Sequence, residues 1–219
     1  MMEVRDSRRI ILDKIKAAKN NQEDRVKTSF PKFKHDSLQY LNDIEDHPEM
    51  EFARNLVQVK GKFAYCANQK ELVLALRILY HEEQWEKIFC AEPSIREYID
   101  RAGIPYSSDL DSLKDTEAAI TGCEFLVART GSIMVSSSQG SGRRVFGHAP
   151  VHIVIGRASQ VVNEIGDALS GIKGKYGEMP SQVSLITGPS RTADIEKTLV
   201  LGAHGPRDLF VFLLNDFQI

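Results

Sequence analysis

Helix-like and strand-like segments alternate in the middle of the chain, and this alternation restricts the possible folds more than any other feature of the sequence. Apolar side chains recur at helical spacing in three segments, 49–60, 69–83 and 94–101. Short apolar runs of the kind found in buried strands separate them, at 62–68 and 86–91. Because short connections between alternating helices and strands are typical of a parallel sheet covered on both faces, the sequence predicts an α/β domain.

Beyond residue 118 the apolar runs are joined by tight turns. Two runs flank residues 129–132, where Gly131 allows a positive φ, so the sequence predicts a β-hairpin there. The other expected elements are a strand at 151–156, a helix at 161–169, a Gly/Lys-rich connection at 170–178, a strand at 183–187, a helix that begins near Thr192 and a strand at 209–214. The predicted sheet is therefore mixed and mostly parallel, is flanked by helices, and carries one appended hairpin.

The first 47 residues differ from this pattern and are predicted to form an N-terminal helical arm. Residues 6–19 are highly charged with isoleucines interspersed, which indicates an amphipathic helix with a narrow apolar stripe. A polar stretch follows at 20–27. Pro31 then ends any helix, because proline lacks a backbone donor. The α/β domain is accordingly assigned to residues 48–219, a length sufficient for one hydrophobic core.

Charge and cysteine content argue against several classes of protein. The 28 Lys and Arg residues against 30 Asp and Glu residues give a net charge of -2, which removes the main electrostatic argument for nucleic-acid binding. The apolar runs are too short to span a bilayer, which needs about 20 residues, so a cytoplasmic location is expected. Cys66, Cys90 and Cys123 lack the spacing of a zinc or iron–sulfur site, and we expect buried thiols and no bound metal.

A polar bend at 187–194 is the first candidate ligand site. It follows a predicted strand and precedes the predicted helix, and free amides at the front of a helix favour anions. An arginine and two hydroxyl groups in the bend strengthen the expectation of an anion site. The candidate ligand-binding residues are Gly188, Ser190, Arg191, Thr192 and Asp194. The alternative is ordinary helix capping by Ser190 or Thr192.

The loop at 136–144 is the second candidate. Glycines permit close backbone approach to a ligand, and an arginine can pair with a carboxylate or a phosphate through two hydrogen bonds. The residues concerned are Ser138, Gly140, Gly142 and Arg143. The loop has neither a Walker sequence nor GxGxxG, so it indicates no particular nucleotide. A solvated loop without a ligand is the alternative.

Two single residues are candidates for proton transfer or nucleophilic attack. His204 lies between glycines in a turn at 202–208 and could act as an acid or base, although it could equally bond a backbone carbonyl. Glu124, at the entry of the hairpin, could act as a nucleophile or base, or could be a surface residue at a strand end. The bend at 187–194 follows a strand whereas the His204 turn precedes one. If both strands are parallel, the two motifs lie at opposite rims of the sheet, which makes His204 the weaker candidate.

Three stretches of the sequence resemble a known family. "TGCEFLVARTGSIMVSSSQGSGR", "APVHIVIG" and "LITGPSRTADIE" followed by "VLGAHGPRDLFVFLL" are similar to the lactate-utilisation family, the LUD domain proteins of the LutC/YkgG type. The resemblance implies a fold of the NagB, ribose-phosphate isomerase and CoA-transferase type. It also implies a role in bacterial oxidation of L-lactate to pyruvate, together with companion iron–sulfur subunits and with no cofactor on this chain. Thr130 and Gly131 enter the set of ligand-binding candidates as family motif positions.

Three functions remain open at this point. The chain is a non-redox subunit of a lactate-oxidising system that binds a small carboxylate or phosphate, a free-standing acyl-transferase-like or phosphosugar-type enzyme with Glu124 as nucleophile, or an assembly factor without a ligand. The sequence leaves open whether the chain is itself catalytic.

Overall fold

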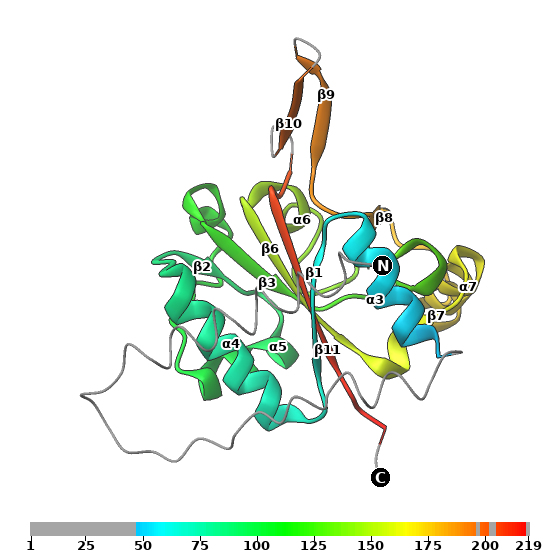
Figure 1. Ribbon diagram of the computed structural model, residues 1–219, viewed down its shortest axis with the longest axis horizontal. Coiled ribbons are helices and arrows are strands. Elements are labelled where there is room, and N and C mark those ends of the chain that lie inside the picture. Colours follow the sequence, from blue (N-terminus) through cyan, green and yellow to red (C-terminus); the bar gives the residue numbers. More distant parts are fainter. Residues whose placement is uncertain (1–46, 196–197, 202–204, 218–219) are drawn as a thin grey trace.

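Two sheets and a separate hairpin contain the strands of the described part of this chain (Figure 1). The structure, a computed structural model, describes residues 47–195, 198–201 and 205–217, and for 191–201 it describes the backbone only. The predicted N-terminal arm, apart from its last residue, lies outside the described residues. The larger sheet has five strands in the order β1-β11-β6-β3-β2, and the smaller has four in the order β7-β4-β5-β8.

The five-stranded sheet is parallel throughout. Its strands are β1 (Lys62–Cys66), β11 (Asp208–Leu214), β6 (Val151–Arg157), β3 (Ala118–Thr121) and β2 (Ile88–Phe89). The central strands β3, β6 and β11 are almost completely buried, as expected of strands covered on both faces. The sheet confirms the α/β fold class that the alternating pattern predicts.

Different elements cover the two faces of this sheet. On one face, α4 (Gln69–Glu83) and α5 (Pro93–Ala102) bury residues such as Leu76 and Ile99 against Ile153 of β6. On the other face, α3 (Pro48–Gln58) and the second sheet form a separate core, in which Leu56 packs with Val211. Helix α5 begins one residue before the predicted segment 94–101, because Pro93 occupies its first position and Glu92 is the N-cap residue.

The predicted hairpin is present and belongs to the second sheet. Strands β4 (Phe125–Val127) and β5 (Ser132–Ser136) pair antiparallel, and Gly131 in the turn has φ 59°. The sheet is completed by β7 (Val161–Val162) and β8 (Val183–Ile186). The hairpin therefore does not extend the parallel sheet, but covers one of its faces.

Helix α7 (Ile165–Tyr176) packs on the outer face of the second sheet. It begins and ends later than the helix predicted over 161–169, and the Gly/Lys-rich connection is in fact helical as far as Tyr176. The reason is that Ala168, Ile172 and Tyr176 follow one another at a spacing of four and form a continuous stripe that contacts the sheet. The extra turns carry Lys175 and Tyr176 to the end of β5.

The prediction of a helix that begins near Thr192 is wrong. Residues Arg191–Ile195 form strand β9, which pairs antiparallel with β10 (Thr198–Leu201), and the two strands extend from the body beyond the start of β11 (Figure 1). Thr192 and Ile195 in β9, like Val200 in β10, are β-branched, and such residues favour extended backbone over helix.

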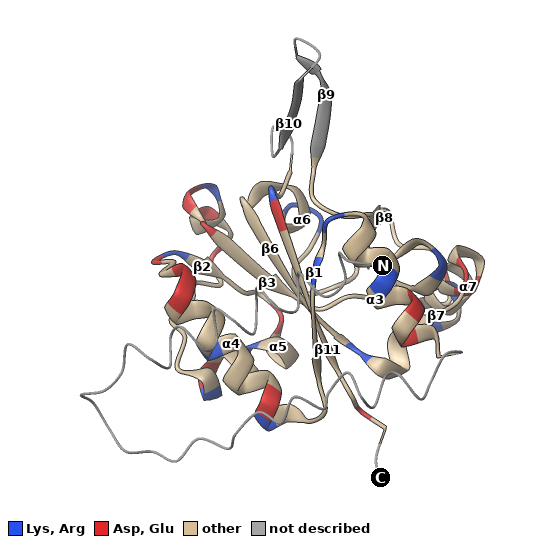
Figure 2. Ribbon diagram, in the orientation of Figure 1, with Lys and Arg blue, Asp and Glu red and all other residues tan. Residues whose placement is uncertain are grey.

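Short helical segments complete the described chain. They are η2 (Leu110–Asp115), η3 (Ala128–Thr130), α6 (Val145–His148) and η4 (Ala158–Gln160). Basic and acidic residues are interspersed over the described part of the chain, in keeping with the near-neutral net charge (Figure 2). Within that part, no helix combines the length and the apolar character needed to traverse a lipid bilayer.

Candidate functional site

A buried carboxylate lies where the two sheets meet. Glu124 stands between β3 and β4, and its side chain has no exposed surface. Ser136 Oγ and Tyr176 Oη donate hydrogen bonds of 2.6 and 2.8 Å to Glu124 Oε1, and Lys175 Nζ donates one of 2.8 Å to Oε2. The alternative that Glu124 is a surface residue at a strand end is therefore wrong. Its carboxylate joins the end of β5 to the last turn of α7.

The surrounding donors keep the Glu124 carboxyl group ionised. Burial by itself would raise its pKa, but the three hydrogen bonds outweigh burial, and the pKa lies below its ordinary value. An ionised carboxylate can only accept hydrogen bonds, so the hydroxyl groups of Ser136 and Tyr176 both act as donors to it. Burial, followed by the hydrogen bond to Glu124, raises the pKa of Tyr176, so this phenol stays neutral.

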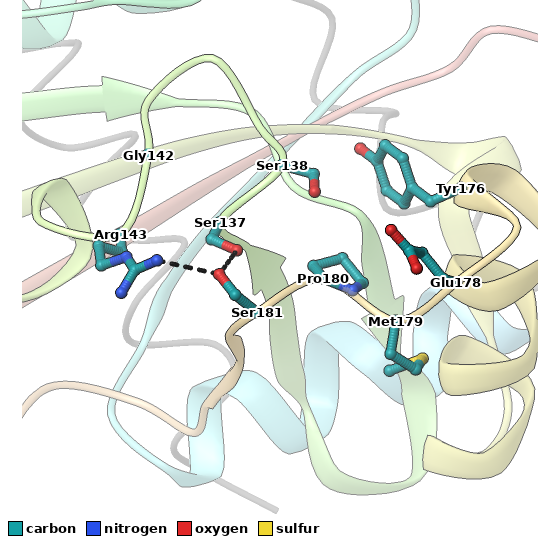
Figure 3. A pocket seen from close by; sticks show the side chains of 9 residues that line it. All are labelled: Ser137, Ser138, Gly142, Arg143, Tyr176, Glu178, Met179, Pro180 and Ser181. Atoms are coloured by element: carbon teal, nitrogen blue, oxygen red, sulfur yellow. Dashed lines mark hydrogen bonds between the residues drawn. The ribbon is translucent and has the colours of Figure 1, made fainter.

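An open crevice of about 470 Å³ lies beside this cluster. It is bounded by the loop after β5 and by the end of α7 with the loop that follows (Figure 3). Arg143 Nη2 donates a hydrogen bond of 2.9 Å to Ser181 Oγ, which is also 3.0 Å from Ser137 Oγ. The lining residues are Ser137, Ser138, Gly142, Arg143, Tyr176, Glu178, Met179, Pro180 and Ser181. Three of the predicted ligand-binding residues, Ser138, Gly142 and Arg143, thus line one crevice.

Glu92 is a buried acid that the sequence reasoning missed. It follows β2 after Cys90 and Ala91, is 8% exposed, and accepts a hydrogen bond of 3.0 Å from the amide of Gly122. Burial is the main reason that the pKa of Glu92 is raised. Gly140 packs against it, with 3.4 Å between an ideal Gly140 Cβ and Glu92 Cγ, and is not among the crevice-lining residues. The available signal was an acid placed immediately after an apolar strand and before a proline.

The bend at 187–190 lies beside the amino ends of the central strands β6 and β11. Ser190 N donates to Pro206 O at 2.8 Å, and Arg207 N donates to Pro150 O, also at 2.8 Å, just before β6 begins. The bend and the turn before β11 are therefore neighbours rather than at opposite rims. The two motifs were expected at opposite rims if both strands were parallel members of one sheet. Strands β8 and β11 belong to different sheets, so this condition is not met.

The structure thus separates the two candidate loops. Neither Gly188 nor Ser190 lines the crevice at Arg143, and the predicted helix that was to supply amides at Thr192 is strand β9. The side chains of Arg191, Thr192 and Asp194, and the whole of His204, lie outside what the structure describes, so their suggested roles stay predictions.

Thr130 and Gly131 form a turn that packs against α3. Asn55 Nδ2 donates to the carbonyl oxygens of Ala128 and Arg129, at 2.8 and 3.0 Å. A Cβ on Gly131 would lie 2.2 Å from Leu56 N. The turn therefore has a packing role, and neither Thr130 nor Gly131 lines the crevice.

The three thiols are buried, as predicted. Burial raises the pKa of Cys90 to about 12, and it also raises the pKa of Cys66 and of Cys123. In the described ranges, no group of three His, Cys, Asp or Glu side chains is arranged to hold a metal ion.

His152 is a buried histidine in β6. Its Nε2 lies 2.9 Å from Thr121 Oγ1, whereas the buried Nδ1 has no hydrogen-bond partner among the residues that the structure describes. Burial lowers the pKa of His152 to about 4, so the ring is neutral in the folded protein at pH 7.

This depressed pKa predicts a loss of stability in mild acid. Between pH 7 and pH 5 an unfolded histidine takes up a proton whereas folded His152 does not, so the free energy of unfolding is expected to fall by about 2 kcal/mol. Urea unfolding at the two pH values, for the wild type and for His152→Gln, measures this contribution. Equal losses in both proteins would show that other groups cause the pH dependence.

Comparison with known proteins assigns a family to the part of the chain that contains the crevice. The family model of the LUD domain matches residues 108–214. The chain carries a LUD domain. The resemblance drawn from the sequence motifs is therefore confirmed. The LUD domain match includes Glu124 and the crevice, whereas Glu92 precedes it.

Curated relatives of this LUD domain chain cover part of its length. An uncharacterized protein of Neisseria meningitidis serogroup B is 38% identical over 116 residues, 51% of this chain and 50% of the relative. Lactate utilization protein C of Shouchella clausii is 30% identical over 60% of this chain and 61% of its own length, and that of Deinococcus radiodurans is 30% identical over 55% and 63%. The alignments thus span about one half to three fifths of these relatives.

A solved structure shares the fold of the LUD domain chain. The crystal structure of a DUF162 family protein from Deinococcus radiodurans superposes with a TM-score of 0.56, over 76% of this chain and 96% of the other, at 17% sequence identity. At that identity the likeness supports the fold and nothing more specific.

Proposed function

We propose that this chain takes part in lactate utilization as a component without a redox cofactor of its own, and that its crevice binds a small carboxylate or phosphate. Several relatives are named lactate utilization protein C, which supports the first half of the proposal. The second half depends on the polar crevice within the matched LUD domain.

The fixed position of Arg143 is the observation that carries the binding proposal. One guanidinium nitrogen donates to Ser181, and within the described part of the chain the other N–H groups of Arg143 have no hydrogen-bond partner, so they are available to a ligand. Hydroxyl groups of Ser137 and Ser138 lie along the same crevice (Figure 3). A guanidinium group flanked by hydroxyl groups suits carboxylate or phosphate, because it donates two parallel hydrogen bonds to either.

Electron transfer is assigned in this proposal to iron–sulfur partner subunits. A cluster needs thiolate ligands, and the three buried thiols of this chain are scattered and have raised pKa values. Such thiols are poor ligands, which supports a role beside a redox subunit rather than in place of one.

The geometry of Glu124 favours a positioning role over nucleophilic attack. Its carboxylate has no exposed surface and already accepts three hydrogen bonds. A nucleophile must present a free lone pair to an acyl group. An acyl-transferase-like enzyme that uses Glu124 is therefore less well supported than ligand binding in the crevice.

Thermal unfolding in the presence of L-lactate, pyruvate and inorganic phosphate tests the binding proposal, because a ligand of the native state raises the melting temperature. We expect a shift with at least one probe, and Arg143→Ala should weaken its binding about tenfold, or about 1.4 kcal/mol. Arg144→Ala removes the same charge from the next position, outside the crevice lining, and should change affinity by less than about twofold. No shift with any probe would instead support an assembly factor without a ligand.

A further inference from the structure

We infer that the crevice prefers anionic ligands that also carry a hydrogen-bond donor, a hydroxyl or an ammonium group, and discriminates against keto analogues of the same skeleton. The inference depends on the proposed binding of an anion at Arg143. It adds the chemistry of the second contact, at the Tyr176 end of the crevice.

The Tyr176 oxygen presents lone pairs rather than a proton to a ligand. A phenol has one proton, and Tyr176 donates it to Glu124 Oε1 over 2.8 Å. This direction is fixed, because an ionised carboxylate has no proton to donate in return. Lys175 Nζ lies 5.0 Å from the centroid of the Tyr176 ring and is itself held by Glu124. Even if Lys175 takes one lone pair, the other remains available, so Tyr176 can only accept from a ligand.

Glu178 adds a second acceptor at the same end. It lines the crevice beside Tyr176, and Figure 3 shows its carboxylate on the same side as the phenol ring. No ion pair joins Glu178 to another residue among the salt bridges of the described chain. A carboxylate accepts hydrogen bonds and attracts cations, so it favours an ammonium group over a neutral one.

The opposite end of the crevice has the reverse polarity. Arg143 lies there, with Ser137 and Ser181 between it and the Tyr176 end (Figure 3), and a guanidinium group only donates. A ligand that satisfies both ends must accept at Arg143 and donate at Tyr176 or Glu178. A keto oxygen at the second position finds no proton on Tyr176 or Glu178 and can accept only from the Ser138 hydroxyl, so it leaves those two acceptors unpaired.

Two matched series of acids test this preference. The short series is L-alanine, L-lactate and pyruvate, and the long series is 5-aminohexanoate, 5-hydroxyhexanoate and 5-oxohexanoate. Two lengths are used because a crevice of about 470 Å³ admits more than a three-carbon acid. Binding is measured by NMR titration of the full chain. In at least one series we expect the amine and the alcohol to bind about tenfold more tightly than the ketone.

Variants assign the preference to its residues. Tyr176→Phe should reduce the affinity for the alcohol to that for the ketone, and Glu178→Gln should weaken the amine selectively. Glu164→Gln, whose parent residue pairs with Arg129 and does not line the crevice, should leave every affinity unchanged. Tyr176→Phe also removes a hydrogen bond to Glu124 and could therefore destabilise the fold. Glu178 is exposed, so Glu178→Gln tests the preference even if Tyr176→Phe is unstable.

The outcomes separate this inference from the proposal on which it depends. Equal affinities within both series, all weakened by Arg143→Ala, would overturn the donor preference and leave anion binding intact. Binding of inorganic phosphate but of none of the six acids would do the same. Failure of phosphate and of every acid to bind would overturn both.

Discussion

Glu124→Ala is expected to lower the free energy of unfolding by about 3 kcal/mol, one of the two largest effects we anticipate. The substitution leaves Lys175 without its carboxylate and leaves the hydroxyl groups of Ser136 and Tyr176 without their acceptor. Unpaired buried donors cost about 1–3 kcal/mol each, and the half-exposed Lys175 recovers part of its loss from water. Urea unfolding followed by circular dichroism measures the change.

Glu164→Ala provides the matched comparison for Glu124. Glu164 also forms an ion pair, at 2.6 Å from Arg129 Nε, but both side chains are about half exposed. Exposed pairs contribute up to about 1 kcal/mol, so this variant should be affected much less. Glu124→Gln keeps the shape of the side chain while removing its charge. Its loss in the free energy of unfolding should lie between those of Glu124→Ala and Glu164→Ala. A loss at Glu124 no larger than that at Glu164 would contradict a stabilising role for the buried cluster.

Gly131→Ala is expected to be at least as damaging, with a loss of about 3 kcal/mol or more. A Cβ at this position would lie 2.2 Å from Leu56 N and 2.3 Å from Asn55 C, both of them backbone atoms of α3. The positive φ of 59° adds about 1–2 kcal/mol of strain for any residue with a Cβ. The turn and α3 must therefore move apart, and the Asn55 hydrogen bonds that join them are lost. The same urea unfolding experiment gives the loss.

Gly103→Ala separates the backbone strain at positive φ from the effect of the close approach between the turn and α3. Gly103 has a similar φ of 70°, and an added Cβ there meets no atom of the described chain within 4 Å. This variant should show the backbone strain alone, about 1–2 kcal/mol. If both variants lose the same stability, the close approach of the turn to α3 contributes nothing.

Local sequence patterns predicted most elements of the fold because their causes are local. The helical spacing of apolar residues over 69–83 and the continuous apolar run at 151–156 each correspond to an element with closely similar bounds. Gly103 ends α5 in the left-handed conformation, as a glycine at that place indicates. The motifs of the second half also identified the LUD domain correctly.

Predictions about which residues come together were less successful. Loop 136–144 was a candidate, but the partners that make it a crevice come from α7, whose last two turns were taken for a connection. The helix expected at Thr192 is a strand, which shows that a polar bend followed by an acid is a weak signal for a helix start when the following residues are β-branched.

Local patterns are sufficient to predict the α/β class, the hairpin at Gly131 and the placement of the thiols in buried segments, because spacing, turn chemistry and burial act within a few residues of the chain. Tertiary packing, by contrast, puts the hairpin in a second sheet, encloses Glu124 with Ser136, Lys175 and Tyr176, and places Arg143 in the same crevice as the end of α7. These contacts join residues 12 to 52 positions apart along the chain, and such pairings depend on how whole elements pack rather than on any local pattern.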